Sequence, residues 1–369
     1  MRTALFVLLL AHGLIHFLGL ARGLGLAELP ELTQDISPRA GILWGIAGTA
    51  LIVTAVLAVA APRWWWALAL PALLLSQAMV VSTWADSRFG TVPNVLILVL
   101  AVHAFAAHGP WSLRAAWERS VRETAGPVVP SGVVTEAELE PLPAPVRRFL
   151  RRAGAVGAPR VGSFRATWRG RIRGGPEEPW MTFTAEQVNV VDPPARSFFM
   201  DARRGGLPVD VFHAYRDGAA TMTVRLVSLV PMVRASGPEL TRAETVTLLN
   251  DLALLAPGAL LDAGARWEHV DDRTARVALT VGAHTVSADL FFDEAGDLVD
   301  FVSDDRLMAS ADGATLTPVR WSTPISTHRD FGGRRAPTVG TGVWHPGGGA
   351  PWGYIELELT GLEMNPPPQ

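Results

Sequence analysis

Long runs of residues without formal charge dominate the first third of the chain. Nineteen such residues separate Arg2 from Arg22, and runs of 23, 22 and 25 follow before residue 114. A helix rises 1.5 Å per residue, so about 20 apolar residues cross the hydrocarbon core of a bilayer. The pattern therefore predicts a transmembrane four-helix domain over residues 1–110.

The first run has a second interpretation, because an arginine followed by an apolar stretch also begins a signal peptide. His12 and His16 lie inside the run, and no small-residue cleavage site of the A-x-A type follows it. We therefore expect an uncleaved membrane helix. In the second run, Gly41 and Gly45 have the GxxxG spacing that allows close helix contact, although chance explains a short pattern in a Gly-rich chain equally well.

Arginines that flank the four runs predict the orientation of the chain in a bacterial cell membrane. Short cytoplasmic loops carry an excess of basic residues. With the N-terminus inside, five arginines fall on the cytoplasmic side and three on the other: Arg2, Arg63, Arg114, Arg119 and Arg122 against Arg22, Arg39 and Arg88. We expect a multi-pass protein whose C-terminal domain is cytoplasmic.

After residue 110 the pattern changes twice. Residues 111–134 combine a short polar helix with a linker rich in Pro and Gly. From about residue 161, apolar and polar positions alternate in segments such as MTFTAEQVNV and TARVALTV, separated by turn sequences such as RDG and DEAGD. Alternation with period two predicts eight or more antiparallel strands in a soluble domain over residues 135–369.

One helical segment interrupts these strands. Thr241 and Glu244 have the spacing of a capping box, and an apolar face follows before Pro257. A helix packed on one face of a large curved sheet makes an open barrel with an apolar hollow. The expected fold is thus an N-terminal four-helix transmembrane bundle followed by a mainly antiparallel β domain, an open half-barrel with an inserted helix.

Composition narrows the possible chemistry. The 369 residues are 49% hydrophobic and 18% charged, which excludes intrinsic disorder. The absence of Cys and Lys from the sequence excludes disulfides, thiolate metal sites, Schiff-base lysines and a P-loop. With a net charge of −3 and no basic, aromatic stripe, nucleic-acid binding is not indicated. Basic residues that are all Arg, with abundant Ala and Gly, are typical of a GC-rich bacterial genome.

Several strings carry a resemblance to a known type of protein. They are HGLIHFLG, WADSRFGTVPN, LPAPVRRFLRRAG, MTFTAEQ, ASGPELTRAE and FGGRRAPT. Together they resemble an uncharacterised bacterial family that joins a small membrane domain to an all-β domain, and the resemblance covers most of the chain. More remotely, the strand-rich domain is similar to half-barrels of the lipoprotein-carrier type, which implies shielding of acyl chains in a concave sheet.

Histidines at membrane depth are the sharpest chemical feature. His12 and His16 are one helical turn apart, so both imidazoles lie on one face of the first helix. His103 in the last run falls in the same leaflet half as His12, and three imidazoles on two helices are a candidate metal or haem site. The alternative is hydrogen bonding of neutral histidines across helices, to Ser76, Gln77 or backbone carbonyls.

Aromatic and aliphatic residues of the predicted strands are the candidate ligand-binding residues. We expect them on the concave face of the sheet or in its packed core: Trp180, Phe183, Phe198, Phe199, Leu290 and Phe291. Glu186 and Arg225 alternate with apolar neighbours and are further candidate ligand-binding residues; the alternative is that they face solvent.

Three functions remain open on this reasoning. The first is binding or handling of an apolar ligand or lipid in the half-barrel. The alternative is a membrane oxidoreductase or metal or haem protein that uses the intramembrane histidines, and the third is a scaffold without ligand or cofactor. The sequence contains no GxSxG, HExxH or GxGxxG motif, so it predicts no catalytic residue.

Overall fold

The computed structural model describes residues 2–124, 131–310 and 315–367. The chain forms two compact units, Met1–Ala115 and Ala116–Gln369. Each unit is described by itself below.

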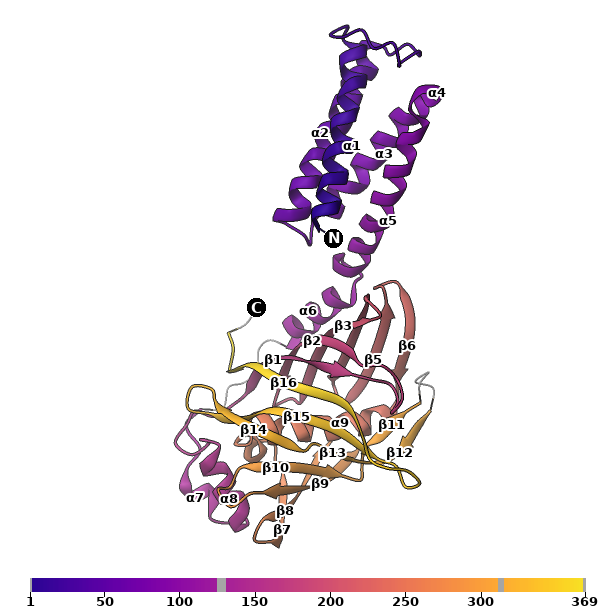
Figure 1. Ribbon diagram of the computed structural model, residues 1–369. Coiled ribbons are helices and arrows are strands. Elements are labelled where there is room, and N and C mark those ends of the chain that lie inside the picture. The colour runs from indigo at the N-terminus through magenta and orange to yellow at the C-terminus, as the bar shows by residue number, and fades with distance from the viewer. Residues whose placement is uncertain (1, 125–130, 311–314, 368–369) are drawn as a thin grey trace. The chain divides into compact units, whose positions relative to one another are not determined.

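The first unit is entirely helical in its described part (Figure 1). Its elements are α1 (Arg2–Gly23), α2 (Pro38–Ala60), α3 (Trp65–Ser82), α4 (Trp84–Ser87), η1 (Arg88–Gly90) and α5 (Thr91–His108). Among the described residues, four helices are long and apolar enough to cross a membrane. The prediction of four apolar helices is confirmed.

Glycines bring α1 and α2 into close contact. A Cβ atom added at Gly48 would lie 2.7 Å from the carbonyl oxygen of Gly13, and one at Gly41 would lie 2.9 Å from Gly23 Cα. Real Cβ atoms do not approach other atoms this closely, so the two helix backbones meet at these points because both residues lack a side chain. Of the two explanations left open for the Gly41 and Gly45 pattern, close helix contact holds at Gly41.

The second unit is built on one large antiparallel sheet. α6 (Leu113–Thr124), α7 (Glu136–Leu139) and α8 (Ala144–Arg152) precede the strands, and α9 (Pro238–Leu255) and α10 (Ala259–Asp262) interrupt them. The strands are β1 (Ser163–Ile172), β2 (Met181–Val190), β3 (Ala195–Arg204), β4 (Leu207–Arg216), β5 (Ala219–Leu226), β6 (Val230–Ser236), β7 (Arg266–Asp271), β8 (Thr274–Val281), β9 (His284–Phe292), β10 (Leu298–Ser303), β11 (Leu307–Ala309), β12 (Leu316–Pro318), β13 (Arg320–Ser322), β14 (Ile325–Asp330), β15 (Arg335–His345) and β16 (Trp352–Met364).

Strand order gives the sheet two free ends. It runs β6-β5-β4-β3-β2-β1-β16-β15-β13-β10-β9-β8-β7, with β14 paired to β15, while β11 and β12 form a separate hairpin. Strands β1 and β16 pair at the centre, with Trp168 opposite Leu359. Among the described strands, β6 and β7 do not pair, so the sheet is not closed into a barrel. This confirms the predicted fold class, an antiparallel open half-barrel.

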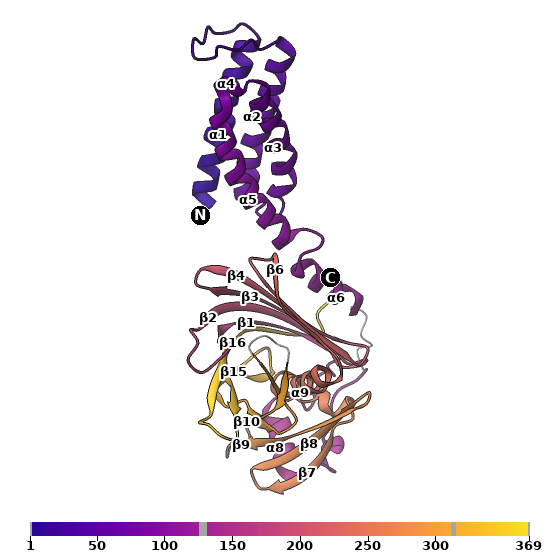
Figure 2. The same cartoon turned by 90° about the vertical axis from the view of Figure 1, so that its right-hand side faces the viewer.

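Helix α9 lies inside the curve of the sheet (Figure 2). Its apolar side chains form the centre of the core, where Val246, Leu249 and Ala253 are fully buried. The alternation of the strands fits this arrangement, because every second side chain points toward the helix. The helix that the sequence predicted as an insertion therefore organises the whole unit.

The capping box expected at Thr241 and Glu244 is wrong. Helix α9 begins three residues earlier, at Pro238, a residue well suited to the first helical position. The Thr241 hydroxyl donates to the Gly237 carbonyl oxygen at 2.8 Å and accepts from the Ala220 N–H at 3.1 Å. Glu244 is thus free to turn into the interior, away from the helix start.

A buried carboxylate ties α8 to the sheet. Asp297, between β9 and β10, accepts paired hydrogen bonds from Arg335 of β15 at 2.7 and 2.9 Å and from Arg152 of α8 at 3.2 and 3.1 Å. Burial alone would raise the pKa of Asp297, but the two arginines hold it at about 2. Three segments far apart in the sequence thereby share one ionic centre.

Candidate ligand-binding site

A cavity of about 390 Å³ lies between the concave face of the sheet, α9 and the β11–β12 hairpin. This volume is within the range of small-molecule sites, roughly 300–1,000 Å³. Most of its wall is apolar, with Phe198 and Met200 from β3, Met222 from β5, and Ile355 and Leu357 from β16. These side chains share one face because strand residues two apart point the same way.

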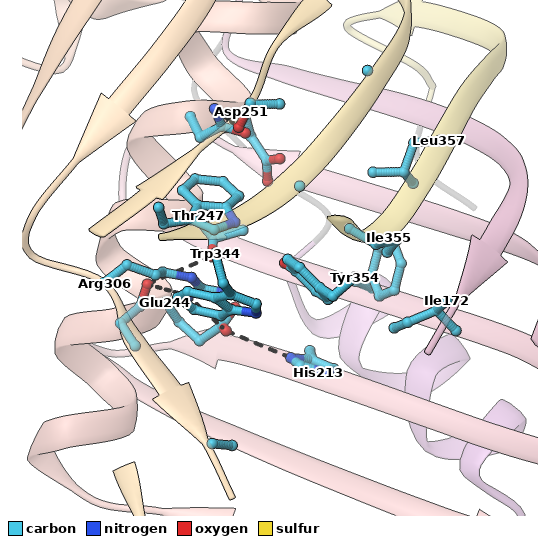
Figure 3. Close-up of a pocket in the computed structure, with 18 of the residues that line it drawn as sticks. Ile172, His213, Glu244, Thr247, Asp251, Arg306, Trp344, Tyr354, Ile355 and Leu357 are labelled. Atoms are coloured by element: carbon cyan, nitrogen blue, oxygen red, sulfur yellow. Dashed lines mark hydrogen bonds and ion pairs between the residues drawn. The ribbon is translucent and has the colours of Figure 1, made fainter. Parts of the chain in front are cut away.

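Charged side chains converge at one side of the cavity (Figure 3). The Glu244 carboxylate of α9 lies 3.3 Å from the Arg306 guanidinium, 3.5 Å from that of Arg196 and 3.7 Å from His213 Nδ1. All four residues line the cavity. Only 5% of the Glu244 side chain is exposed. Its negative charge is therefore stabilised by the neighbouring cationic side chains and not by solvation.

Asp251, two turns further along α9, binds the guanidinium group of Arg196. Its Oδ2 atom accepts hydrogen bonds from Arg196 at 2.7 Å, Gln187 at 2.6 Å and Asn189 at 3.1 Å. The three donors come from β2 and β3. The network therefore fixes α9 against these two strands and holds the Arg196 side chain in one position beside Glu244.

The two carboxyl groups respond differently to this environment. Burial alone would raise the pKa of Glu244, but Arg306, His213 and Arg196 shift it far below the ordinary value. The pKa of Asp251 is raised, because burial outweighs the opposing effect of Arg196 and Asn189. Glu244 is therefore the carboxylate whose charge balances Arg306 across the physiological pH range.

Of the residues predicted for ligand binding, the structure places Phe198 in the cavity wall. Phe183 belongs to the same hydrophobic cluster as Phe198 but does not line the cavity. Trp180 precedes β2, and its ring stacks under the guanidinium groups of Arg171 and Arg173. The first two share one cluster, whereas Trp180 lies outside the cavity lining.

The other three predicted ligand-binding residues are not brought to the cavity. Glu186 faces away from it, in an ion pair with Arg165 at 2.8 Å. Arg225 lies opposite Asp210 in the pairing of β4 with β5, and Phe291 is half-buried on β9.

Two further apolar residues, expected on the concave face or in the core, also lie outside the cavity lining. Phe199 contacts the Trp117 ring of α6, with centroids 6.4 Å apart, and Leu290 is fully buried in the core.

The histidines of α1 take part in a hydrogen-bonded group. His12 Nε2 donates to Asn94 Oδ1 at 2.8 Å, and His16 Nε2 lies 2.8 Å from the Ser76 hydroxyl. The interhelical bond to Ser76 is the one that the alternative interpretation expected. His103 lies nine residues beyond Asn94 on α5, about 13 Å along the helix. Within the described residues, no group of three or more His, Asp or Glu is placed to hold a metal ion.

The residues that form the polar side of the cavity were not predicted. Arg196, Glu244, Asp251 and Arg306 are separated in the sequence, and charged residues on strands face solvent by default. A signal was nevertheless present in α9. Glu244 and Asp251 are seven residues apart, and so lie on one face of a helix whose residues are mostly buried.

An open antiparallel sheet curved around one helix, with a partly polar cavity between them, defines an open half-barrel. Residues 132–357 match a family described as "Family of unknown function (DUF6544)", and the chain belongs to this family. The expected membership of an uncharacterised family is confirmed.

Two solved structures are similar in fold to this chain. One is a domain described as an outer membrane lipoprotein-sorting protein from Vibrio parahaemolyticus, with a TM-score of 0.35. The other is a DUF1329 family protein from Desulfovibrio piger, with a TM-score of 0.36. Each is 14% identical, and each comparison covers 60% of this chain and 92% of the other. The comparison with curated proteins found no match.

Proposed function

We propose that the C-terminal unit binds an apolar molecule, such as the acyl chain of a lipid, in the cavity of the half-barrel. The cavity itself carries this proposal. Its wall consists mostly of apolar side chains, and it is roomy enough for a small ligand rather than only for ordered water.

Apolar burial supplies the binding energy in this proposal. Each methylene group transferred from water into such a cavity contributes about 0.8 kcal/mol. Met200, Met222 and Met308 are flexible and polarizable side chains that adapt to ligands of different shape. The proposed function is therefore binding or handling of a chain-like ligand.

The N-terminal helices have a matching role in the proposal. They hold the protein in a bacterial cell membrane as a multi-pass domain over residues 1–110, and residues 111–134 link it to the soluble domain over residues 135–369. From the flanking arginines, the C-terminal domain is cytoplasmic. Protease digestion of sealed inside-out vesicles would remove it, and cleavage only in right-side-out vesicles would reverse this orientation.

Filling the cavity tests the ligand-binding proposal. Thr247 of α9 lines the cavity (Figure 3), so Thr247→Trp places a large side chain in the ligand's space. Thr184 on β2 is exposed between Phe183 and Ala185, which face the interior, and Thr184→Trp is the matched control.

The assay is titration of the full chain, in nanodiscs, with the fluorescent probe N-phenylnaphthylamine. We expect saturable binding in the wild type and in Thr184→Trp, and at least tenfold weaker binding in Thr247→Trp. Equal binding by both variants would refute the proposal.

A further inference from the structure

The polar side of the cavity contains nitrogen atoms whose hydrogen bonds are incomplete. Within the described residues, Arg306 Nε, Trp321 Nε1 and His213 Nδ1 are buried and make no hydrogen bond of ordinary geometry. The nearest acceptors act on them only weakly: the Tyr354 hydroxyl on Arg306 and Trp321, and the Glu244 carboxylate on His213. All three residues line the cavity. The residues come from β4, β13 and the segment after β10, so three separate elements meet at this side of the cavity.

The chemistry of these atoms indicates what is missing. An arginine Nε and an indole Nε1 carry a proton and can only donate a hydrogen bond. His213 Nδ1 lies 3.7 Å from a Glu244 carboxylate oxygen, which favours the proton on that nitrogen. The absent partner is therefore an acceptor, because buried donors in folded proteins are nearly always satisfied.

The donors are held in place before any ligand arrives. Arg306 Nη1 donates to the Ala243 carbonyl oxygen and lies 3.3 Å from Glu244. Its guanidinium carbon also sits over the Trp321 ring, 5.3 Å from the centroid. These contacts use Nη1 and one face of the guanidinium, and they leave Nε to donate to a further acceptor.

We propose that this side of the cavity receives the anionic oxygen head group of an amphipathic ligand, a carboxylate or a phosphate, whose chain occupies the apolar wall. The inference rests on the proposed function, because the head group is bound only if the chain enters the cavity. It adds that the ligand is an acceptor at its polar end, and that amphiphiles with a cationic head bind more weakly.

Matched tryptophan variants test the head-group site. Trp321→Phe removes one donor and keeps an aromatic ring. Trp267→Phe is the control, because Trp267 Nε1 is also buried without a partner within the described residues but lies outside the cavity lining. The full chain in nanodiscs is titrated with dodecanoate, dodecyl phosphate and dodecylammonium in competition with N-phenylnaphthylamine.

The loss of a hydrogen bond to a charged group weakens affinity about tenfold. We expect this loss for dodecanoate or dodecyl phosphate in Trp321→Phe and no change in Trp267→Phe. Dodecylammonium should bind the wild type more weakly than the anions do, and Trp321→Phe should leave its affinity unchanged. The anion with the larger loss identifies the source, a free fatty acid or a phosphorylated lipid.

A second pair of variants tests the same site if Trp321→Phe does not fold. His213→Phe removes another cavity nitrogen, and His328→Phe is its control, since His328 Nε2 is buried and unpartnered within the described residues but does not line the cavity.

Two outcomes separate the inference from the proposed function. If Thr247→Trp blocks all three amphiphiles equally, while Trp321→Phe and His213→Phe leave the anions unaffected, the cavity binds chains and the head-group site is refuted. If Thr247→Trp blocks none of them, the proposed function itself fails.

Discussion

Glu244 is the carboxylate on which the buried charges of the cavity converge, and its replacement is the most demanding test of the packing described above. Glu244→Gln keeps the shape of the side chain and removes its charge. Arg306 and Arg196 then lose their shared counter-charge in a site where the Glu244 side chain is only 5% exposed. Breaking a buried ion pair from one side costs about 3–5 kcal/mol.

The expected loss lies at the lower end of that range. Arg306 still donates to the Ala243 carbonyl oxygen and Arg196 still pairs with Asp251, and glutamine retains one acceptor oxygen. We therefore expect Glu244→Gln to lower the free energy of unfolding of the C-terminal unit by about 3 kcal/mol.

A surface ion pair with shorter distances provides the control. Arg169 and Glu358 approach to 2.6 Å, but their side chains are 64% and 43% exposed. Water and salt screen such a pair, so Glu358→Gln should cost about 0–1 kcal/mol. Burial, and not the distance between the charges, therefore decides which of the two substitutions lowers the free energy of unfolding more.

Pulse proteolysis of the full chain in urea measures both variants. The C-terminal unit becomes cleavable when it unfolds, and the midpoint reports its stability. With a slope of about 3 kcal/mol/M, Glu244→Gln should shift the midpoint down by about 1 M. A shift no larger than that of Glu358→Gln would refute the proposed importance of the buried charge cluster.

Two further predictions follow from contacts elsewhere in the chain. The pKa of Asp297 is about 2 in the folded protein against an ordinary 3.8, so the ionised carboxylate contributes about 2 kcal/mol to the free energy of unfolding. This contribution is complete above pH 4 and is lost as the pH falls toward 2. The stability difference between wild type and Asp297→Asn, measured by the same proteolysis, should therefore shrink over that interval, and a constant difference would contradict this. Gly48→Leu forces α1 away from α2 at Gly13 and should lower the thermal aggregation temperature of the detergent-solubilised chain. Val53→Leu, on an exposed helix face, should leave this temperature unchanged. Equal temperatures for the two variants would refute the close helix contact.

The helices and strands could be predicted because their constraints are local. A membrane helix requires an uncharged run of fixed length, and the segments that became α1, α2, α3 and α5 each have one. Likewise β2 and β8 alternate residue by residue, as a strand with one buried face must. Nothing local predicts that β1 pairs with β16, since that pairing joins residues almost 200 positions apart.

The site was harder to predict because it depends on long-range neighbours. Phe198 and Phe199 are adjacent and equally apolar, yet one faces the cavity and the other faces Trp117. The register of β3 alone makes this choice. Glu244 fitted a capping box equally well until the arginines of β3 and of the segment after β10 were placed beside it.

The most direct test is the amount of lipid that co-purifies with the full chain. Native mass spectrometry of the Thr184→Trp variant should show about one tightly held amphiphile per protein, carrying a carboxylate or phosphate, and the Thr247→Trp variant should have lost it. Equal lipid in the two variants would mean that the half-barrel is empty and that the membrane helices hold whatever lipid is present.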